Sequence, residues 1–243
     1  MDYPASKHSF TFKHFVVRQS QSAMKVGTDG VMLGAWAGVE QRPNRILDVG
    51  TGTGLVALML AQRCPWAERI DAVEIEPQAA CEARCNMESS PWAAHLNIFN
   101  ESFQLFAQRG QQKYDLIVSN PPYFNGTYKS PAVERTAARH VELLGTDDLI
   151  EGVGRVIEPA SGRFVAIFPY ENGAVFIAKA ALCGLYCNRI LNIYSKVGGH
   201  IKRIILEFST ARMALIEQSI AIMDENGFTE QYRALTKEFY LKF

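Results

Sequence analysis

Four consecutive residues, Asn120-Pro121-Pro122-Tyr123, combine hydrogen-bond acceptors, a rigid turn and an aromatic ring directly after the apolar run Leu116–Val118. Each proline fixes its own φ and has no N–H, so two in a row stiffen the backbone and leave its carbonyls as acceptors. The Asn120 side chain adds an amide oxygen, and the Tyr123 ring offers a face on which a base or an amide can stack. This corner is therefore suited to holding a planar amino group, whose two hydrogens need two acceptors.

An amino group held in this way becomes a better nucleophile. Two acceptors at a fixed angle draw its nitrogen toward tetrahedral geometry, and the lone pair is then localised for attack. The same four residues are also compatible with an ordinary strand that ends in a proline turn. The remainder of the chain has to decide between the two interpretations.

A glycine loop follows an earlier apolar strand. Arg45–Val49 is predicted as the strand and Leu55–Gln62 as a helix, with Gly50, Gly52 and Gly54 between them. Strand, glycine loop and helix begin a nucleotide-binding fold, in which the backbone approaches the ligand closely. The third glycine comes one position too early for the dinucleotide fingerprint, so nicotinamide binding is disfavoured.

Carboxylates follow the next two strands. The strand Arg69–Glu74 ends in an acid roughly 20 residues after the glycine loop, where a carboxylate can accept both hydroxyls of a ribose. In the simpler alternative, Glu74 or Glu76 caps the helix that begins near Pro77. Glu101 follows the third strand and would meet an adenine, or else lies in solvent as an ordinary loop acid.

The segment Lys25–Gly30 contains two glycines and precedes Val31–Trp36, which has helical character. Thr28 or Asp29 can serve as the N-cap of this helix. In a functional interpretation the same two residues roof a small-molecule pocket. Further upstream, Phe10–Phe12 is predicted to be a short strand or one arm of a hairpin.

Strands and helices alternate from residue 45 to residue 119 at the spacing of βαβ units, which predicts a parallel sheet with right-handed crossovers. The Asn120 corner then lies beside the glycine loop, at the edge where open α/β sheets bind ligands. Two later strands, Leu185–Ile193 and His200–Phe208, are predicted to form an antiparallel pair at the sheet edge. Residues 124–140 read as a long loop of the kind that often acts as a lid.

Composition limits the class of protein. With 243 residues, of which 48% are hydrophobic, the chain is long enough for one large α/β domain. Its 25 basic and 25 acidic residues give a net charge of zero, so contact with a nucleic acid would need a local basic patch.

The five cysteines show neither a zinc pattern nor an even disulfide set. No apolar run approaches the ~18–20 residues of a membrane span, and the start does not resemble a signal peptide. We therefore expect a soluble, cytoplasmic protein with reduced thiols.

Three features together resemble class I S-adenosylmethionine-dependent methyltransferases that methylate amino groups: Ile46–Gly54, Glu74 and the Asn120–Tyr123 corner. Other segments resemble the bacterial tRNA1(Val) adenine-N6 methyltransferase family, and with them the likeness covers nearly the whole chain. These segments are Phe10–Lys13, Met24–Gly30, Leu33–Trp36, Leu58–Arg63, Ser90–Ala93 and Tyr232–Leu241. The loop and the corner are typical of the whole superfamily, whereas Lys25–Gly30 and the C-terminal tail favour this one family.

The resemblance implies a class I (Rossmann-like) fold, with a mostly parallel seven-stranded sheet, an antiparallel edge pair and helices on both faces. Residues 1–243 would form one methyltransferase domain, with an N-terminal extension of about 40 residues packed on it. It also implies methylation of adenine 37, next to the anticodon of tRNA1(Val). No metal is expected, because a sulfonium methyl is already activated.

The site residues follow from the same likeness. Asn120, Pro121, Pro122 and Tyr123 would be catalytic. S-adenosyl-L-methionine would be bound by Lys25, Thr28, Asp29, Asp48, Gly50, Gly52, Gly54, Glu74, Glu101 and Asn120. Glu101 stands where an Asp is common in the family.

A tRNA partner must be held by local charge. Basic residues gather in the N-terminal segment, in the 124–140 loop and around the Gly198-Gly199 turn. The predicted RNA contacts are Lys13, Arg18, Arg135, Arg139, Lys196, Lys202 and Arg203. We expect the protein to act as a monomer.

Three other activities compete with this hypothesis. A glutamine side-chain amide fits the same corner, but glutamine-N5 methyltransferases carry a helical substrate-binding domain for which ~40 residues leave no room. A guanine-N2 rRNA methyltransferase is a second alternative. A non-catalytic nucleotide-binding module is a third, although it has no need for the Asn120 corner.

Overall fold

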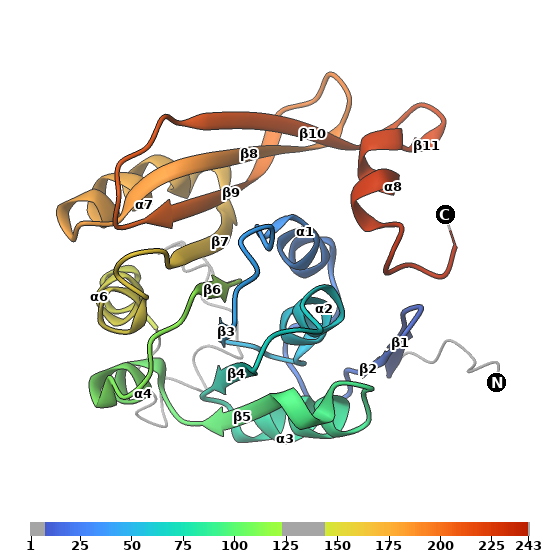
Figure 1. The fold of residues 1–243 in the computed structure, drawn as a ribbon. Coiled ribbons are helices and arrows are strands. Elements are labelled where there is room, and N and C mark those ends of the chain that lie inside the picture. The colour runs from blue at the N-terminus through green and yellow to red at the C-terminus, as the bar shows by residue number, and fades with distance from the viewer. Residues whose placement is uncertain (1–7, 123–143, 243) are drawn as a thin grey trace.

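Nine strands form one sheet in the computed structural model, which describes residues 8–122 and 144–242. Within this part of the chain the strand order is β11-β10-β8-β9-β7-β6-β3-β4-β5 (Figure 1). The strands from β5 to β7 are all parallel. Their bounds are β3 (Arg45–Val49), β4 (Arg69–Glu74), β5 (Leu96–Asn100), β6 (Leu116–Ser119) and β7 (Arg163–Pro169).

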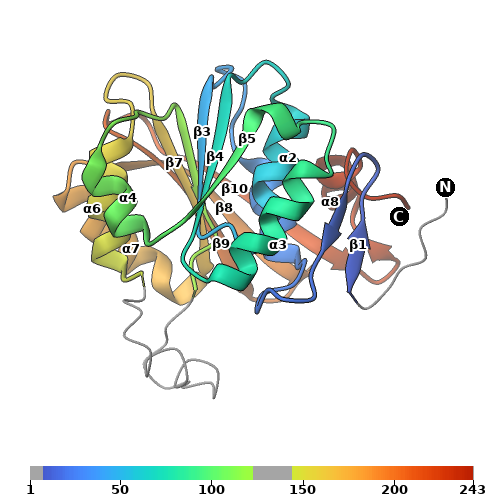
Figure 2. The same cartoon turned by 90° about the horizontal axis from the view of Figure 1, so that it is seen from below.

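Helices cover both faces of the sheet, and each face has its own apolar core. Figure 2 shows α4, α6 and α7 on one side and α2, α3 and α8 on the other. The bounds are α1 (Thr28–Trp36), α2 (Leu55–Arg63), α3 (Pro77–Glu88), α4 (Phe103–Arg109), α6 (Thr146–Val156), α7 (Tyr170–Leu182) and α8 (Glu230–Thr236), with a 3-10 turn η1 at Ala93–His95. The predicted α/β class with helices on both faces is confirmed.

The antiparallel pair is β8 (Tyr186–Lys196) with β9 (Ile201–Ser209), as the sequence predicts. It does not form the sheet edge, however, because β10 (Ile216–Asp224) pairs with β8 in parallel. The short β11 (Gly227–Phe228) then closes that side. The sheet therefore has two strands more than the seven expected.

The two ends of the described chain meet beside α2. β1 (Ser9–Thr11) and β2 (Val16–Arg18) form a separate antiparallel hairpin. Beyond β1, Phe12 pairs with Tyr240, and the Lys13 N–H donates to the Phe239 carbonyl at 2.8 Å. Because Phe12 is buried in the same core as residues of α1 and α2, the N-terminal hairpin packs against the main sheet and its helices.

Candidate active site

A cavity of about 290 Å³ opens at the carboxyl ends of β3 and β6. Three segments surround it: the glycine loop after β3, the segment that leads into α1, and Asn120 after β6. The lining residues are Met24, Lys25, Gly27, Thr28, Asp29, Gly30, Asp48, Gly50, Thr51, Gly52, Thr53, Leu55, Val56 and Asn120. Seven of the ten predicted cofactor residues are in this set, whereas Gly54, Glu74 and Glu101 are not. The sequence did not single out Met24, Leu55 or Val56, which as apolar residues carry no chemical signal.

The glycine loop leaves bare backbone against the cavity. Gly50, Gly52 and Gly54 have φ values of +70°, +56° and +83°, which favour glycine over any residue with a side chain. A Cβ added at Gly50 or Gly52 would meet no other atom within 4 Å. Space beside the loop is therefore open for a ligand. Gly54 differs, because its missing Cβ faces Met87 and Ala83 of α3 and the residue is the N-cap of α2.

Asp48 braces the loop from behind. Its side chain is 1% exposed, and Oδ2 accepts hydrogen bonds from the Thr51 hydroxyl at 2.6 Å and from the Ala57 N–H at 3.1 Å. Burial raises the pKa of Asp48 to about 7 against these two hydrogen bonds, and nearby Glu74 raises it further. Asp48 thus fixes the turn onto the start of α2.

Glu74 ties the same loop to the second strand. Its Oε2 accepts from the Gly52 N–H at 2.8 Å, and its Oε1 accepts from the Glu76 N–H at 2.9 Å. Burial raises the pKa of Glu74, and the backbone hydrogen bonds oppose that shift. Glu76 is the N-cap residue of α3 as the alternative predicted, but no side chain makes a cap hydrogen bond there, and Glu74 lies two residues further upstream. Glu74 does not line the cavity, but it is one hydrogen bond from Gly52, which does.

The register of β3 and β6 brings Asn120 next to the glycine loop. Ser119 pairs with Val49, and the Ser119 hydroxyl donates to the Val49 carbonyl at 2.9 Å, so the next residues, Asn120 and Gly50, are neighbours. Asn120 lines the cavity. Pro121 is buried and Pro122 is exposed, while Tyr123 lies outside the described residues.

The wall opposite the glycine loop is the segment that leads into α1. An ion pair links it to β9. Gly27 is the N-cap of α1 without a side-chain cap, so the expectation that Thr28 or Asp29 caps the helix is wrong. Asp29 instead accepts a hydrogen bond from Arg203 Nε at 2.7 Å as part of an ion pair. Arg203, a predicted RNA contact, therefore supports the wall of the cavity.

Glu101 does not line the cavity, and it forms an ion pair with Arg109 at 2.5 Å. The neighbouring Asn100 reaches back to the loop after β4, where its side-chain N–H donates to the Glu74 carbonyl at 2.8 Å. Asn100, and not Glu101, is therefore the residue that supports the backbone at Glu74. A polar residue at the end of a third strand is the sequence signal that could have indicated it.

Two of the other predicted RNA residues lie at the same end of the sheet as the cavity. Lys196 and Lys202 are exposed on either side of the β8–β9 turn, which is at the cavity edge because β8 runs parallel to β6 and β7. Arg18 is exposed at the end of β2, whereas the Lys13 ammonium donates to the Lys237 carbonyl at 2.6 Å. Arg135 and Arg139, like the whole 124–140 loop, lie outside the described residues.

Within residues 8–122 and 144–242, no helix has the length and apolar character needed to cross a membrane. The same residues contain no group of three or more His, Cys, Asp or Glu side chains that could hold a metal ion.

A glycine loop after the first strand of the parallel sheet, an acid after the second and an amide corner after the fourth define a class I methyltransferase. A family model for the methyltransferase small domain matches residues 34–146. The fold is similar to the solved structure of a predicted O-methyltransferase from Agrobacterium tumefaciens, with a TM-score of 0.66, 19% identity and coverage of 87% of this chain and 96% of that one.

Sequence relatives narrow the class. The tRNA1(Val) (adenine(37)-N6)-methyltransferase of Histophilus somni strain 129Pt is 41% identical over 240 residues, which are 98% of this chain and 100% of the relative. The enzyme of the same name from Bacteroides fragilis is 41% identical over 239 residues, covering 98% of this chain and 99% of the relative. The chain therefore belongs to the tRNA1(Val) (adenine(37)-N6)-methyltransferase family.

Proposed function

We propose that the protein transfers a methyl group from S-adenosylmethionine to the exocyclic N6 amine of adenine 37 in tRNA1(Val). The observation that carries this proposal is the position of Asn120 on the wall of the glycine-loop cavity. The Asn120 side chain, which can accept hydrogen bonds from an amine, therefore lines the same cavity as a glycine loop of the nucleotide-binding type. Relatives that match this chain over 98% of its length support the same substrate by their names.

The lining residues suggest how the cofactor is oriented. Lys25 is the only Lys or Arg among the described residues of the cavity wall, so it would attract the carboxylate of the methionine moiety. At the other end, the Glu74 carboxylate beside Gly52 would accept the ribose hydroxyls. The open space over Gly50 and Gly52 fits a ligand in close contact with the backbone. The sulfonium would then lie between these ends, near Asn120.

Bound S-adenosylmethionine supplies a methyl group that its positive sulfur has already activated. The protein has to align the amine with that methyl and expose the lone pair of the nitrogen. Asn120 Oδ1 and the Pro121 carbonyl would accept the two amine hydrogens. As the N–C bond forms, the S–C bond breaks, and the amine becomes acidic enough to lose its proton to solvent without a strong general base.

The base must leave its stack to reach this corner, which favours an adenine in a loop over a paired one. We propose that Arg18, Lys196 and Lys202 guide the RNA, because they are exposed near the edge of the sheet where the cavity opens. A neutral chain with a local basic edge suits a partner whose contacts are mainly phosphates.

The test is a transfer assay with labelled S-adenosylmethionine and four acceptors. The acceptors are tRNA1(Val), the same tRNA with guanine at position 37, ribosomal RNA and peptide release factors. We expect label in the unchanged tRNA alone, recovered as N6-methyladenosine by mass spectrometry of its nucleosides. Label in the guanine-37 tRNA or in ribosomal RNA would contradict the adenine assignment, and label in release factors would indicate glutamine methylation.

A further inference from the structure

The segment around residues 19–27 leads into α1 and is called the outer wall of the cavity. Two buried polar side chains of α3, Glu82 and Asn86, hold this segment in place. Both lie on the side of α3 that faces the N-terminal segment, and both are more than 90% buried. Neither residue lines the cavity. Their hydrogen bonds nevertheless lead to it.

Glu82 holds the segment Ser20–Ser22 through five hydrogen bonds. Oε1 accepts from the Ser20 N–H at 2.6 Å, the Ser20 hydroxyl at 3.0 Å and the Gln21 N–H at 3.1 Å. Oε2 accepts from the Ser22 N–H at 2.9 Å and the Ser22 hydroxyl at 2.7 Å. Burial alone would raise the pKa of Glu82, but these hydrogen bonds outweigh it and lower the pKa below its usual value. The carboxylate is thus the centre of a turn built around a negative charge.

Asn86 lies one helical turn further along and connects the same segment to the glycine loop. Its Oδ1 accepts from the Arg18 N–H at 2.9 Å. Its side-chain N–H groups donate to the Arg18 carbonyl and to the Thr53 carbonyl, each at 2.9 Å. Since Thr53 lines the cavity, α3 fixes both walls from one side.

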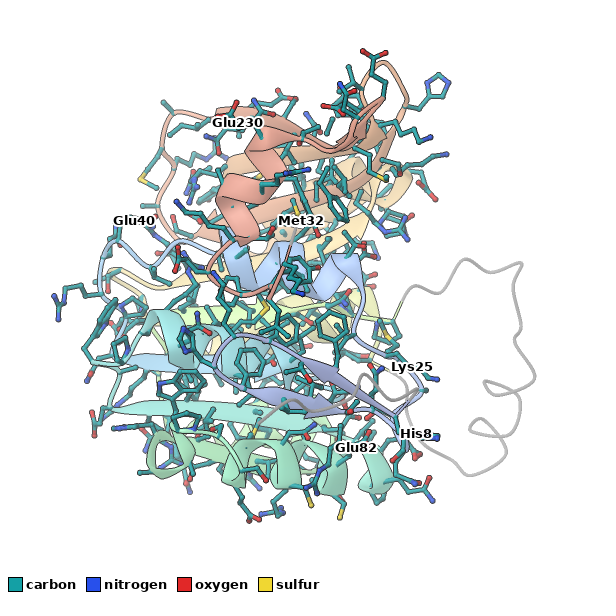
Figure 3. All side chains as sticks on the ribbon, turned by 90° about the vertical axis from the view of Figure 1, so that its right-hand side faces the viewer. His8, Lys25, Met32, Glu40, Glu82 and Glu230 are labelled. Atoms are coloured by element: carbon teal, nitrogen blue, oxygen red, sulfur yellow. The ribbon has the colours of Figure 1, made fainter. Side chains whose placement is uncertain are left out.

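The anchored segment leads directly to Lys25. Gln19 Oε1 accepts from the Val26 N–H at 2.8 Å, which closes the chain between these residues into a loop. Glu82 therefore holds the middle of this loop, and Lys25 is presented at its end. Figure 3 shows the labelled Glu82 and Lys25 in the same corner of the molecule.

We propose that Glu82 is a positioning residue for the cofactor: by holding Ser20–Ser22 it places Lys25 where the methionine carboxylate binds. The inference rests on the proposed function, because it takes S-adenosylmethionine as the ligand of the cavity. A neutral amide cannot replace the carboxylate, since its N–H group would face the N–H donors that surround it. The loop would then shift, and Lys25 with it.

Glu82→Gln should weaken the binding of S-adenosylmethionine at least about tenfold, the scale of one lost charge-assisted hydrogen bond. Calorimetry on the purified full chain measures this dissociation constant without RNA. In steady-state assays the KM for the cofactor should rise while kcat at saturating cofactor stays within about twofold, because Asn120 is held by β6. Glu88→Gln, an exposed acid on the same helix, is the matched control and should bind as the wild type does.

A double-mutant cycle separates positioning from general destabilisation. In a Lys25→Ala background, Glu82→Gln should change cofactor affinity by less than about threefold, since its effect passes through Lys25. An undiminished effect in that background, or wild-type affinity in the single variant, would overturn the proposal. If Glu82→Gln does not fold, Ser20→Ala with Ser22→Ala removes only two hydroxyl donors and should raise the dissociation constant in the same direction. Failure of the wild type to bind S-adenosylmethionine would refute the proposed function instead.

Discussion

Buried carboxylates support the two walls of the cavity, and their pKa values are shifted in opposite directions. Asp48 supports the glycine loop and accepts two hydrogen bonds, and burial raises its pKa to about 7. Glu82 supports the N-terminal segment and accepts five, and its pKa is lowered. Asp48 is the more deeply buried and has fewer donors, whereas the five hydrogen bonds to Glu82 outweigh the cost of its burial, so Glu82 is the more stable of the two as an anion.

The difference indicates two ways of building a wall. The inner wall is formed by the glycine loop and Asn120. Its shape is set by the ends of β3 and β6 and by the positive φ values of the glycine loop. The outer wall is a segment without strand partners around residues 19–27, and it depends on one buried charge for its shape. We therefore expect the inner wall to govern chemistry and the outer wall to govern affinity for the cofactor.

The largest effect should come from the inner wall. Asn120→Ala should lower kcat at least ~100-fold, the scale expected when a preorganised polar group at the reacting centre is removed. Cofactor affinity, measured by calorimetry, should stay near the wild-type value. Near-normal turnover would show that Asn120 does not hold the amine. It would also contradict the expectation that the inner wall governs chemistry and the outer wall governs cofactor affinity.

A smaller effect, on affinity alone, is expected at the end of β4. Glu74→Ala removes the acceptor proposed for the ribose hydroxyls and a hydrogen bond to the Gly52 N–H, so the dissociation constant for S-adenosylmethionine should rise about tenfold. Chemistry at saturating cofactor should change less than binding does. Unchanged affinity in calorimetry would leave Glu74 only its role in fixing the loop.

The inner wall is also the part of the site that could be predicted from the sequence. The strands Arg45–Val49 and Arg69–Glu74 have their predicted bounds, because apolar runs and βαβ spacing act locally. The outer wall could not be predicted, since Glu82 meets Ser20–Ser22 about 60 positions away and no local pattern links them. β10 was missed for another reason: its first four residues are exposed, and acidic and polar residues interrupt its apolar run.

The pH dependence of stability should differ between the two carboxylates. The folded-state pKa of Asp48 lies above its ordinary value of 3.8, so the folded protein binds the extra proton between that pH and about 7. The contribution of Asp48 to stability is therefore lost as the pH rises through this window. Asp48→Asn should remove that loss, and denaturant unfolding should show the variant gaining stability relative to the wild type from pH 5 to pH 8. A constant difference across this range would contradict the assigned pKa shift.

Glu82 should show the opposite sign. Its folded-state pKa is lowered, so its contribution is present above the unfolded-state pKa and is lost as the pH falls through the folded-state pKa. Acid should therefore weaken the hydrogen bonds that Glu82 makes to the outer wall, whereas Asp48 behind the inner wall stays protonated. Hydrogen exchange at Ser20–Ser22 should rise on acidification before exchange at Gly50–Gly52 does, once both are corrected for intrinsic rates. Simultaneous opening of both segments would mean that the two walls are one cooperative unit.

The smallest effect is expected among the exposed basic residues proposed to guide the RNA, Arg18, Lys196 and Lys202, because each single contact contributes little to the affinity for tRNA. Lys202 is exposed on β9, next to Arg203, which is paired with Asp29 at 2.7 Å. Arg203→Ala would therefore disturb the cavity wall as well as the proposed RNA contact, whereas Lys202→Ala tests a proposed phosphate contact alone. Lys202→Ala should make the plot of log tRNA affinity against log salt less steep by roughly 0.7–0.9, with unchanged cofactor affinity. Lys113→Ala is the matched control, because Lys113 precedes β6 at the opposite end of the sheet and its ammonium bonds to the Arg155 carbonyl. Equal slopes for the wild type and both variants would place the tRNA on another surface.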